Sequence, residues 1–199
     1  MRYPLFLIII FIFSTAVLFS QNNTDIFSRA MNEYQNRNYS EAYSLFNNLT
    51  DIDEIDERLI STSDYFASEC LIALNQADGA ISRLENLIEK YPNSNYRELS
   101  LYRLGSLYFD LKLFDKSREK LVKMVNDYPL SEYSGSAYHL IGESFVEENR
   151  MDEAEDFFNS AVLSKLFSIT TLHGSPKCLE STITLPEIQR PIPPSAQVL

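Results

Sequence analysis

Residues 101–154 read LYRLGSLYFDLKLFDKSREKLVKMVNDYPLSEYSGSAYHLIGESFVEENRMDEA, and within this stretch one helical pattern is written twice. Setting Gly105 beside Gly142 gives an offset of 37 residues (142 − 105) that brings the flanking positions into register. The aligned pairs are Leu104 with Ile141, Tyr108 with Phe145, Phe114 with Met151, Asp115 with Asp152, Leu121 with Phe158 and Met124 with Ala161. Self-similarity at a fixed period of this size indicates a solenoid of stacked helical hairpins.

Two weaker copies lie upstream. The same offset aligns Leu121 with Leu84 and Pro129 with Pro92, and one further step of 38 residues aligns Leu84 with Phe46. Apolar residues recur at helical spacing in every copy. The sequence therefore predicts an all-α chain with four hairpins, at residues 23–56, 61–94, 98–131 and 135–166.

The third copy resembles the tetratricopeptide repeat. Leu104, Gly105, Tyr108, Leu121 and Pro129 occupy places of that motif, and the match extends over most of residues 21–166. The resemblance implies an α-solenoid of about four helix-turn-helix repeats that forms a right-handed superhelix. The period exceeds the usual length of about 34 residues, so each linker has about one extra helical turn.

The sequences of two linkers resemble those of particular proteins within this repeat family. Residues 91–94 read Tyr-Pro-Asn-Ser and residues 128–131 read Tyr-Pro-Leu-Ser. This form looks like the periplasmic repeat proteins of the outer-membrane barrel assembly machinery and of the Tol-Pal system. The resemblance implies a role in outer-membrane assembly or envelope integrity, although the cysteine used for lipid attachment by the barrel-assembly relative is missing here.

Residues 1–20 have the character of a secretory signal peptide. Arg2 supplies the positive charge, residues 5–13 the apolar run, and residues 14–20 the approach to a cleavage site before Gln21. We expect export to the periplasm or the periphery of the outer membrane. The alternative is an inner-membrane anchor formed by residues 5–19, although this run is shorter than the ~20 residues that a spanning helix needs.

Charge and side-chain chemistry exclude several functions. A net charge of −11 with no basic stripe argues against nucleic acid. The two histidines, His139 and His173, lie outside any cluster with metal-ligand spacing, and no phosphate loop or activated nucleophile is found. We expect no enzyme activity, no metal and no cofactor. Cys70 is expected to pack in the core. The sequence leaves open whether it forms a disulfide with Cys178.

A polar residue recurs where the second helix of each hairpin begins. Ser40, Asp78, Asp115 and Asp152 share this position, and each has a side chain suited to accept a backbone N–H as a helix N-cap. Asp152 and Glu155 have the spacing of a capping box. We therefore expect four periodic caps.

The first helix of each repeat lines the concave wall in proteins of this family, which implies where a partner binds. The candidate partner-binding residues are Phe27, Met31, Tyr34, Tyr65, Glu69, Ile72, Tyr102, Ser106, Phe109, His139, Glu143 and Val146. Aromatic rings suit an interface, but the same rings could instead pack between neighbouring helices. The sequence leaves the two alternatives open.

These features predict a non-catalytic exported scaffold that binds a protein or peptide in the cell envelope. Membrane contact would come only through an uncleaved leader or a membrane-protein partner. A glycan- or peptidoglycan-binding protein is one alternative, because aromatic rings also stack on sugars. An N-terminal fragment of a larger repeat protein is another.

Residues 167–199 are expected to form an irregular tail. Five of the chain's prolines fall here, at positions 176, 186, 191, 193 and 194, and the helical period is lost. The tail could cover the last hairpin, dock as a polyproline-type segment, or reflect an altered reading frame.

Overall fold

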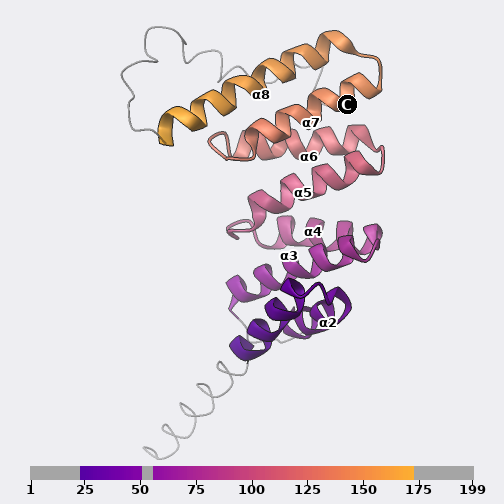
Figure 1. Cartoon of the computed structure of the whole chain (residues 1–199), viewed down its shortest axis with the longest axis vertical. Helices are drawn as coiled ribbons and strands as arrows, with labels where there is room; N and C mark the ends of the chain where they lie inside the picture. Colours follow the sequence, from indigo (N-terminus) through magenta and orange to yellow (C-terminus); the bar gives the residue numbers. More distant parts are fainter. Residues whose placement is uncertain (1–22, 51–55, 173–199) are drawn as a thin grey trace, which may run out of the picture. The chain divides into compact units, whose positions relative to one another are not determined.

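The computed structural model describes residues 23–50 and 56–172, and within them every regular element is a helix (Figure 1). Residues 1–22, which contain the predicted leader, residues 51–55 and residues 173–199, including Cys178, lie outside the described residues. Two compact units follow one another along the chain, and the division between them falls at Tyr96 and Arg97, between the second and third repeats.

The first unit contains two hairpins. Residues 23–35 are helical and are followed by α2 (Tyr39–Thr50), and the second hairpin consists of α3 (Glu57–Ala73) and α4 (Ala77–Lys90). The second unit contains α5 (Arg97–Asp110), α6 (Phe114–Asp127), α7 (Ser134–Glu147) and α8 (Met151–Leu172), in which each helix packs against the next. The predicted all-helical repeat architecture is confirmed.

The period of the helices matches the period of the sequence. The second helices of the last three repeats begin at Ala77, Phe114 and Met151, which are 37 residues apart, and α2 begins 38 residues before Ala77. A backbone feature repeats at the same spacing: each hairpin turns through one non-glycine residue with a left-handed φ, between 58° and 64°. These residues are Arg37, Asn75, Lys112 and Asn149.

Each left-handed residue is part of a Schellman turn, which closes the first helix of the hairpin. In the third repeat the Lys112 N–H donates to the Phe109 carbonyl at 2.8 Å, and the Leu113 N–H donates to the Tyr108 carbonyl at 2.9 Å. Equivalent pairs of bonds close the other three hairpins. The turn satisfies carbonyls that the helix end would leave unpaired, so all four hairpins turn in the same way.

The predicted N-caps are wrong. Asp78 and Asp115 are the second residues of α4 and α6, and neither helix has a side-chain hydrogen bond at its N-cap. The Schellman turn ends at Gln76 and Leu113, which therefore become the caps. Asp78, Asp115 and Asp152 instead lie in the first helical turn, where their negative charge interacts favourably with the positive end of the helix dipole.

The helices of a hairpin approach closely at a position reserved for small residues. A Cβ added to Gly105 would lie 2.5 Å from Leu121 Cγ, and one added to Gly142 would lie 2.7 Å from the Phe158 ring. In the first two repeats Ala30 and Ser68 hold this position, and both are fully buried. The glycine of the sequence motif therefore marks the contact between α5 and α6.

Replacing Gly105 by alanine is expected to destabilise the chain by about 1 to 3 kcal/mol, because the added methyl overpacks this contact. Gly79→Ala is the matched control: its Cβ would meet only the end of the Leu71 side chain, at 3.3 Å, and alanine favours helix. Urea unfolding of the two variants measures the difference. Equal midpoints would contradict the close α5–α6 approach.

Two linkers with the Tyr-Pro-x-Ser sequence share the same pair of serine hydrogen bonds. The Ser94 N–H donates to the Tyr91 carbonyl at 3.0 Å, and the Ser94 hydroxyl accepts the Tyr96 N–H at 3.1 Å. Ser131 makes the equivalent pair of bonds with Tyr128 and Tyr133, at 3.1 and 3.0 Å. The extra residues of the long period therefore form a serine-stabilised turn rather than added helix.

The last helix is longer than predicted. α8 continues to Leu172, so the expectation that helical structure ends at residue 166 is wrong. The physical reason is in the sequence: residues 167–172 contain no glycine or proline, and the first helix breakers are Gly174 and Pro176.

Candidate functional site

The predicted binding residues of the first repeat pack around its core. Phe27, Met31 and Tyr34 are half-buried against a cluster that includes Ala30 and Phe46. The Phe27 ring meets the Phe46 ring edge-on, with centroids 5.8 Å apart. In this repeat the rings therefore pack between neighbouring helices, which was one of the two alternatives for them.

Tyr65 is also packed in the first unit. Its side chain is 7% exposed, and its ring stacks on Tyr96 with centroids 4.9 Å apart. Phe66 meets the two rings edge-on, at 5.4 and 5.7 Å. Glu69 and Ile72, the other predicted residues of α3, are half-buried. Tyr65 therefore lacks the exposed surface of a binding anchor.

In the second unit the predicted residues are more accessible. Tyr102, Ser106 and Phe109 lie on one face of α5, and His139, Glu143 and Val146 hold the same repeat positions on α7. α5 and α7 contact each other, so the two rows lie on neighbouring helices. We call these six residues the α5–α7 face. Four of them are half-buried, whereas His139 and Val146 are exposed.

Tyr102, the first residue of this face on α5, belongs to a tyrosine pair that was not predicted from the sequence. Tyr102 stacks on Tyr133 with ring centroids 5.4 Å apart, as Tyr65 stacks on Tyr96 in the first unit. Burial, followed by the neighbouring Glu132 carboxylate, raises the pKa of Tyr133 above its ordinary value. The 37-residue spacing of Tyr96 and Tyr133 was the available signal.

The polar groups near the pair are held in place. The Glu98 carboxylate accepts the Ser131 hydroxyl, which fixes the linker to the start of α5. On α7 the His139 ring lies 5.4 Å from the Phe158 ring, and its Nδ1 is 3.6 Å from the Glu143 carboxylate. The face thus combines aromatic surface with carboxylate and imidazole groups.

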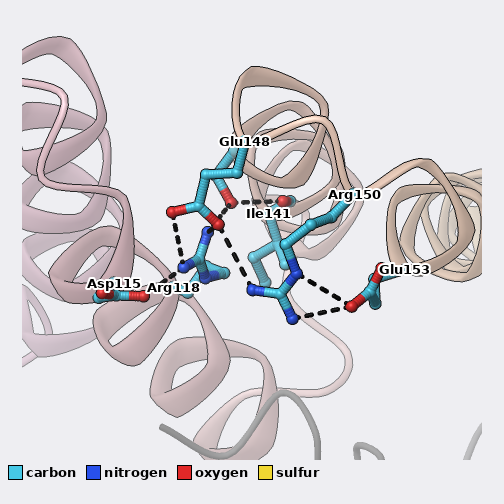
Figure 2. Close-up of polar contacts among 7 residues, drawn as sticks. Asp115, Arg118, Ile141, Glu148, Arg150 and Glu153 are labelled. Carbon is cyan, nitrogen blue, oxygen red and sulfur yellow. Dashed lines mark hydrogen bonds and ion pairs between the residues drawn. The ribbon is translucent and has the colours of Figure 1, made fainter.

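A buried arginine fixes α6 against α7, as Figure 2 shows. Arg118 is 3% exposed and pairs with Asp115 and with Glu148, 3.0 Å away. Its guanidinium carbon also lies 4.5 Å from the centroid of the Phe145 ring. Burying a charge is costly unless it is paired, and here the pairing joins two repeats.

Arg150 extends the same network across the last turn. Its guanidinium nitrogens lie 3.4 Å from the Glu148 carboxylate and 2.8 Å from the Glu153 carboxylate (Figure 2). Its guanidinium carbon lies 4.5 Å from the Phe145 ring centroid. Glu148 therefore bridges two arginines and holds the turns of the third and fourth repeats side by side. Nothing in the period of the sequence predicts this cluster, because Arg118 and Arg150 have no counterparts in the other copies.

The described residues show little reactive chemistry. They include no group of three or more His, Cys, Asp or Glu side chains that could hold a metal ion. Burial raises the pKa of the Cys70 thiol to about 12, so the thiol stays protonated, and its side chain is part of the core as expected. In residues 23–50 and 56–172 no helix is both long and apolar enough to cross a bilayer.

Comparison with known families matches this fold. One tetratricopeptide repeat model matches residues 67–94 and 99–131, and a second matches residues 135–165. These three segments therefore match the tetratricopeptide repeat, which generally serves as a non-catalytic scaffold for protein partners. The matches are to the repeat in general, so the likeness to barrel-assembly and Tol-Pal proteins stays a prediction.

Solved structures share the architecture at low identity. A crystal structure of MamA is 18% identical with a TM-score of 0.65, and the match covers 78% of this chain and 86% of that one. The TPR-like repeats of a kinesin-light-chain-type protein from Podosopora anserina are 16% identical with a TM-score of 0.59, covering 73% and 75%. Likeness at this level shows the fold alone. A search of curated proteins returns no match.

Proposed function

We propose that this chain is a non-catalytic scaffold of the cell envelope that binds a segment of another envelope protein on its α5–α7 face. The observation that carries the proposal is the half-exposed Tyr102–Tyr133 stack. Tyrosine presents a large, rigid surface with a polar edge and is enriched at protein interfaces.

The face is built to be rigid before a partner arrives. Tyr102 is held by its stack on Tyr133, and the Ser106 hydroxyl donates to the Tyr102 carbonyl at 3.0 Å. A rigid surface loses little conformational entropy on binding, which favours affinity. The carboxylate of Glu143 on the same face favours a segment that offers hydrogen-bond donors or positive charge.

The envelope location rests on the leader-like residues 1–20, and a role in outer-membrane assembly or envelope integrity rests on the linker resemblance. Cell fractionation with an antibody to the chain tests the location. A processed form in the periplasmic or outer-membrane fraction is expected, and an unprocessed soluble cytoplasmic form would contradict export.

Tyr102→Ala is expected to weaken partner binding by about 2 kcal/mol or more, roughly 30-fold, because a stacked aromatic anchor is lost. Capture of envelope proteins on the immobilised chain, followed by titration of the captured partner, measures this effect. Leu130→Ala is the control, because Leu130 is exposed in a linker outside the face.

Circular dichroism must show that both variants keep their helicity. A folded Tyr102→Ala variant that captures the same partner with unchanged affinity would contradict the proposal. Muramidase treatment of the extract separates a protein partner from peptidoglycan, since loss of capture after treatment would assign the face to a glycan.

A further inference from the structure

The turns of the third and fourth repeats carry apolar side chains that the helical core does not use. Leu111 and Leu113 flank the left-handed Lys112 and are 43% and 44% exposed, and Met151 at the start of α8 is 55% exposed. The corresponding turn of the second repeat has Leu74 and Gln76 at the leucine positions and Ala77 at the methionine position. We call Leu111, Leu113 and Met151 the turn patch.

The two turns that carry these side chains are fixed to each other by ion pairs. Arg118, one turn into α6, pairs with Asp115 at the third-repeat turn and with Glu148 at the fourth-repeat turn. Arg150 then links Glu148 to Glu153 at the start of α8 (Figure 2). The patch is therefore held on a rigid base rather than on a free loop.

The patch also continues into the α5–α7 face. Phe109 is the third residue of that face on α5, and its ring meets Phe114, the first residue of α6, with centroids 5.5 Å apart. Val146 is its counterpart on α7 and is 36% exposed. Phe109 and Val146 therefore extend the α5–α7 face toward the turns that carry the patch.

The charges around the patch indicate the chemistry of its partner. Asp115, Glu148 and Glu153 are paired with Arg118 and Arg150. Three further acidic residues lie at the same turns, and all three are exposed without an ion-pair partner among the described residues. They are Asp110, Glu147 and Asp152. Two exposed lysines, Lys112 and Lys116, lie at the third-repeat turn, so the acidic residues still outnumber the unpaired cations and the rim is acidic.

We propose that the turn patch, together with Phe109 and Val146, docks a protein segment in which aliphatic side chains alternate with lysine or arginine. Aliphatic groups would cover the exposed leucines and the methionine, and the cations would face the acidic rim. The acidic rim disfavours an anionic bilayer, which carries the same sign of charge. The proposal rests on the proposed scaffold function and names the class of its partner.

The test titrates the full chain into three labelled synthetic peptides of equal length, read by fluorescence anisotropy. In them leucine alternates with lysine, leucine alternates with glutamate, or serine alternates with lysine. We expect the leucine–lysine peptide to bind at least about tenfold more tightly than the other two, because both contacts are needed. Equal binding of the serine–lysine peptide would overturn the proposal in favour of charge alone.

The double variant Leu111→Ser/Leu113→Ser is expected to weaken the leucine–lysine peptide at least about tenfold. Leu130→Ser is the matched control, because Leu130 is 78% exposed and lies at the other end of the 14-residue helix α6. Equal losses in the two variants, or no loss in the double variant, would overturn the proposal.

Two other occupants are tested in parallel with the same double variant. Concentration-dependent self-association in sedimentation velocity that the variant abolishes would overturn the proposal and assign the patch to a second copy of the chain. Flotation with anionic phospholipid vesicles that the variant abolishes would overturn it in favour of a membrane surface. We expect neither.

Tyr102→Ala separates this inference from the proposed function. If the variant retains peptide binding that Leu111→Ser/Leu113→Ser loses, the turn patch is upheld and the tyrosine pair is not part of the site. If Tyr102→Ala loses envelope-partner binding and the double variant does not affect any peptide, the α5–α7 face is upheld and the turn patch is overturned.

Discussion

Replacing Leu121 by alanine is expected to destabilise the chain by about 2 to 5 kcal/mol, because the shortened side chain leaves a cavity between packed helices. Leu121 is completely buried in α6, and its Cγ fills the space above Gly105 in α5. The repeat requires glycine at position 105, because a Cβ there would collide with the Leu121 side chain. Urea unfolding followed by circular dichroism measures the loss.

Leu130→Ala makes the same chemical change on an exposed side chain and is expected to alter stability by less than about 0.5 kcal/mol. Replacing the exposed Asp110 is likewise expected to have little effect. Similar midpoints for Leu121→Ala and Leu130→Ala would show that the second-helix core register is wrong.

The second large effect is expected at Tyr65. Tyr65→Ala should lower the free energy of unfolding by about 3 kcal/mol or more, because a buried ring between Tyr96 and Phe66 is removed. Tyr65→Phe keeps the ring and should restore most of the loss. Thermal unfolding of the purified variants gives both values.

This result would separate two tyrosines that lie 37 residues apart and occupy the same position of the repeat. Tyr65→Ala should change stability, whereas Tyr102→Ala should chiefly change binding, because Tyr102 is more exposed. If Tyr65→Ala unfolded at the wild-type temperature, the packing assignment for the first unit would be contradicted.

The sequence predicted the helical hairpins well because their period is carried by many residues at once. Gly105 and Leu121 have counterparts 37 or 38 residues apart in the other repeats. A small residue opposite a leucine or phenylalanine indicates a close approach of two helices. The sequence could predict which candidate residues share one face of a helix, because residues three or four apart on α5 or α7 lie on the same face.

The caps could not be predicted from residue type alone. Aspartate is favoured both as an N-cap and within the first turn, and the Schellman turn decided between these positions. Its left-handed residue is Arg, Asn or Lys here rather than glycine, so the usual sequence signal is absent.

The Arg118 cluster was missed for a different reason. Arg118, Glu148 and Arg150 are brought together by the packing of α6 on α7, and a single sequence does not show which charged side chains meet across helices. The exposure of Tyr102 relative to Tyr65 has the same origin, because both occupy one position of the repeat.

The most direct test of the scaffold account places a photo-crosslinking amino acid at position 102 of the chain in intact cells. Lys123, exposed on α6, provides the control position. The account predicts a discrete crosslinked product with an envelope protein from position 102 and none from position 123. The same products from both positions, or no product from position 102 in correctly exported protein, would contradict it.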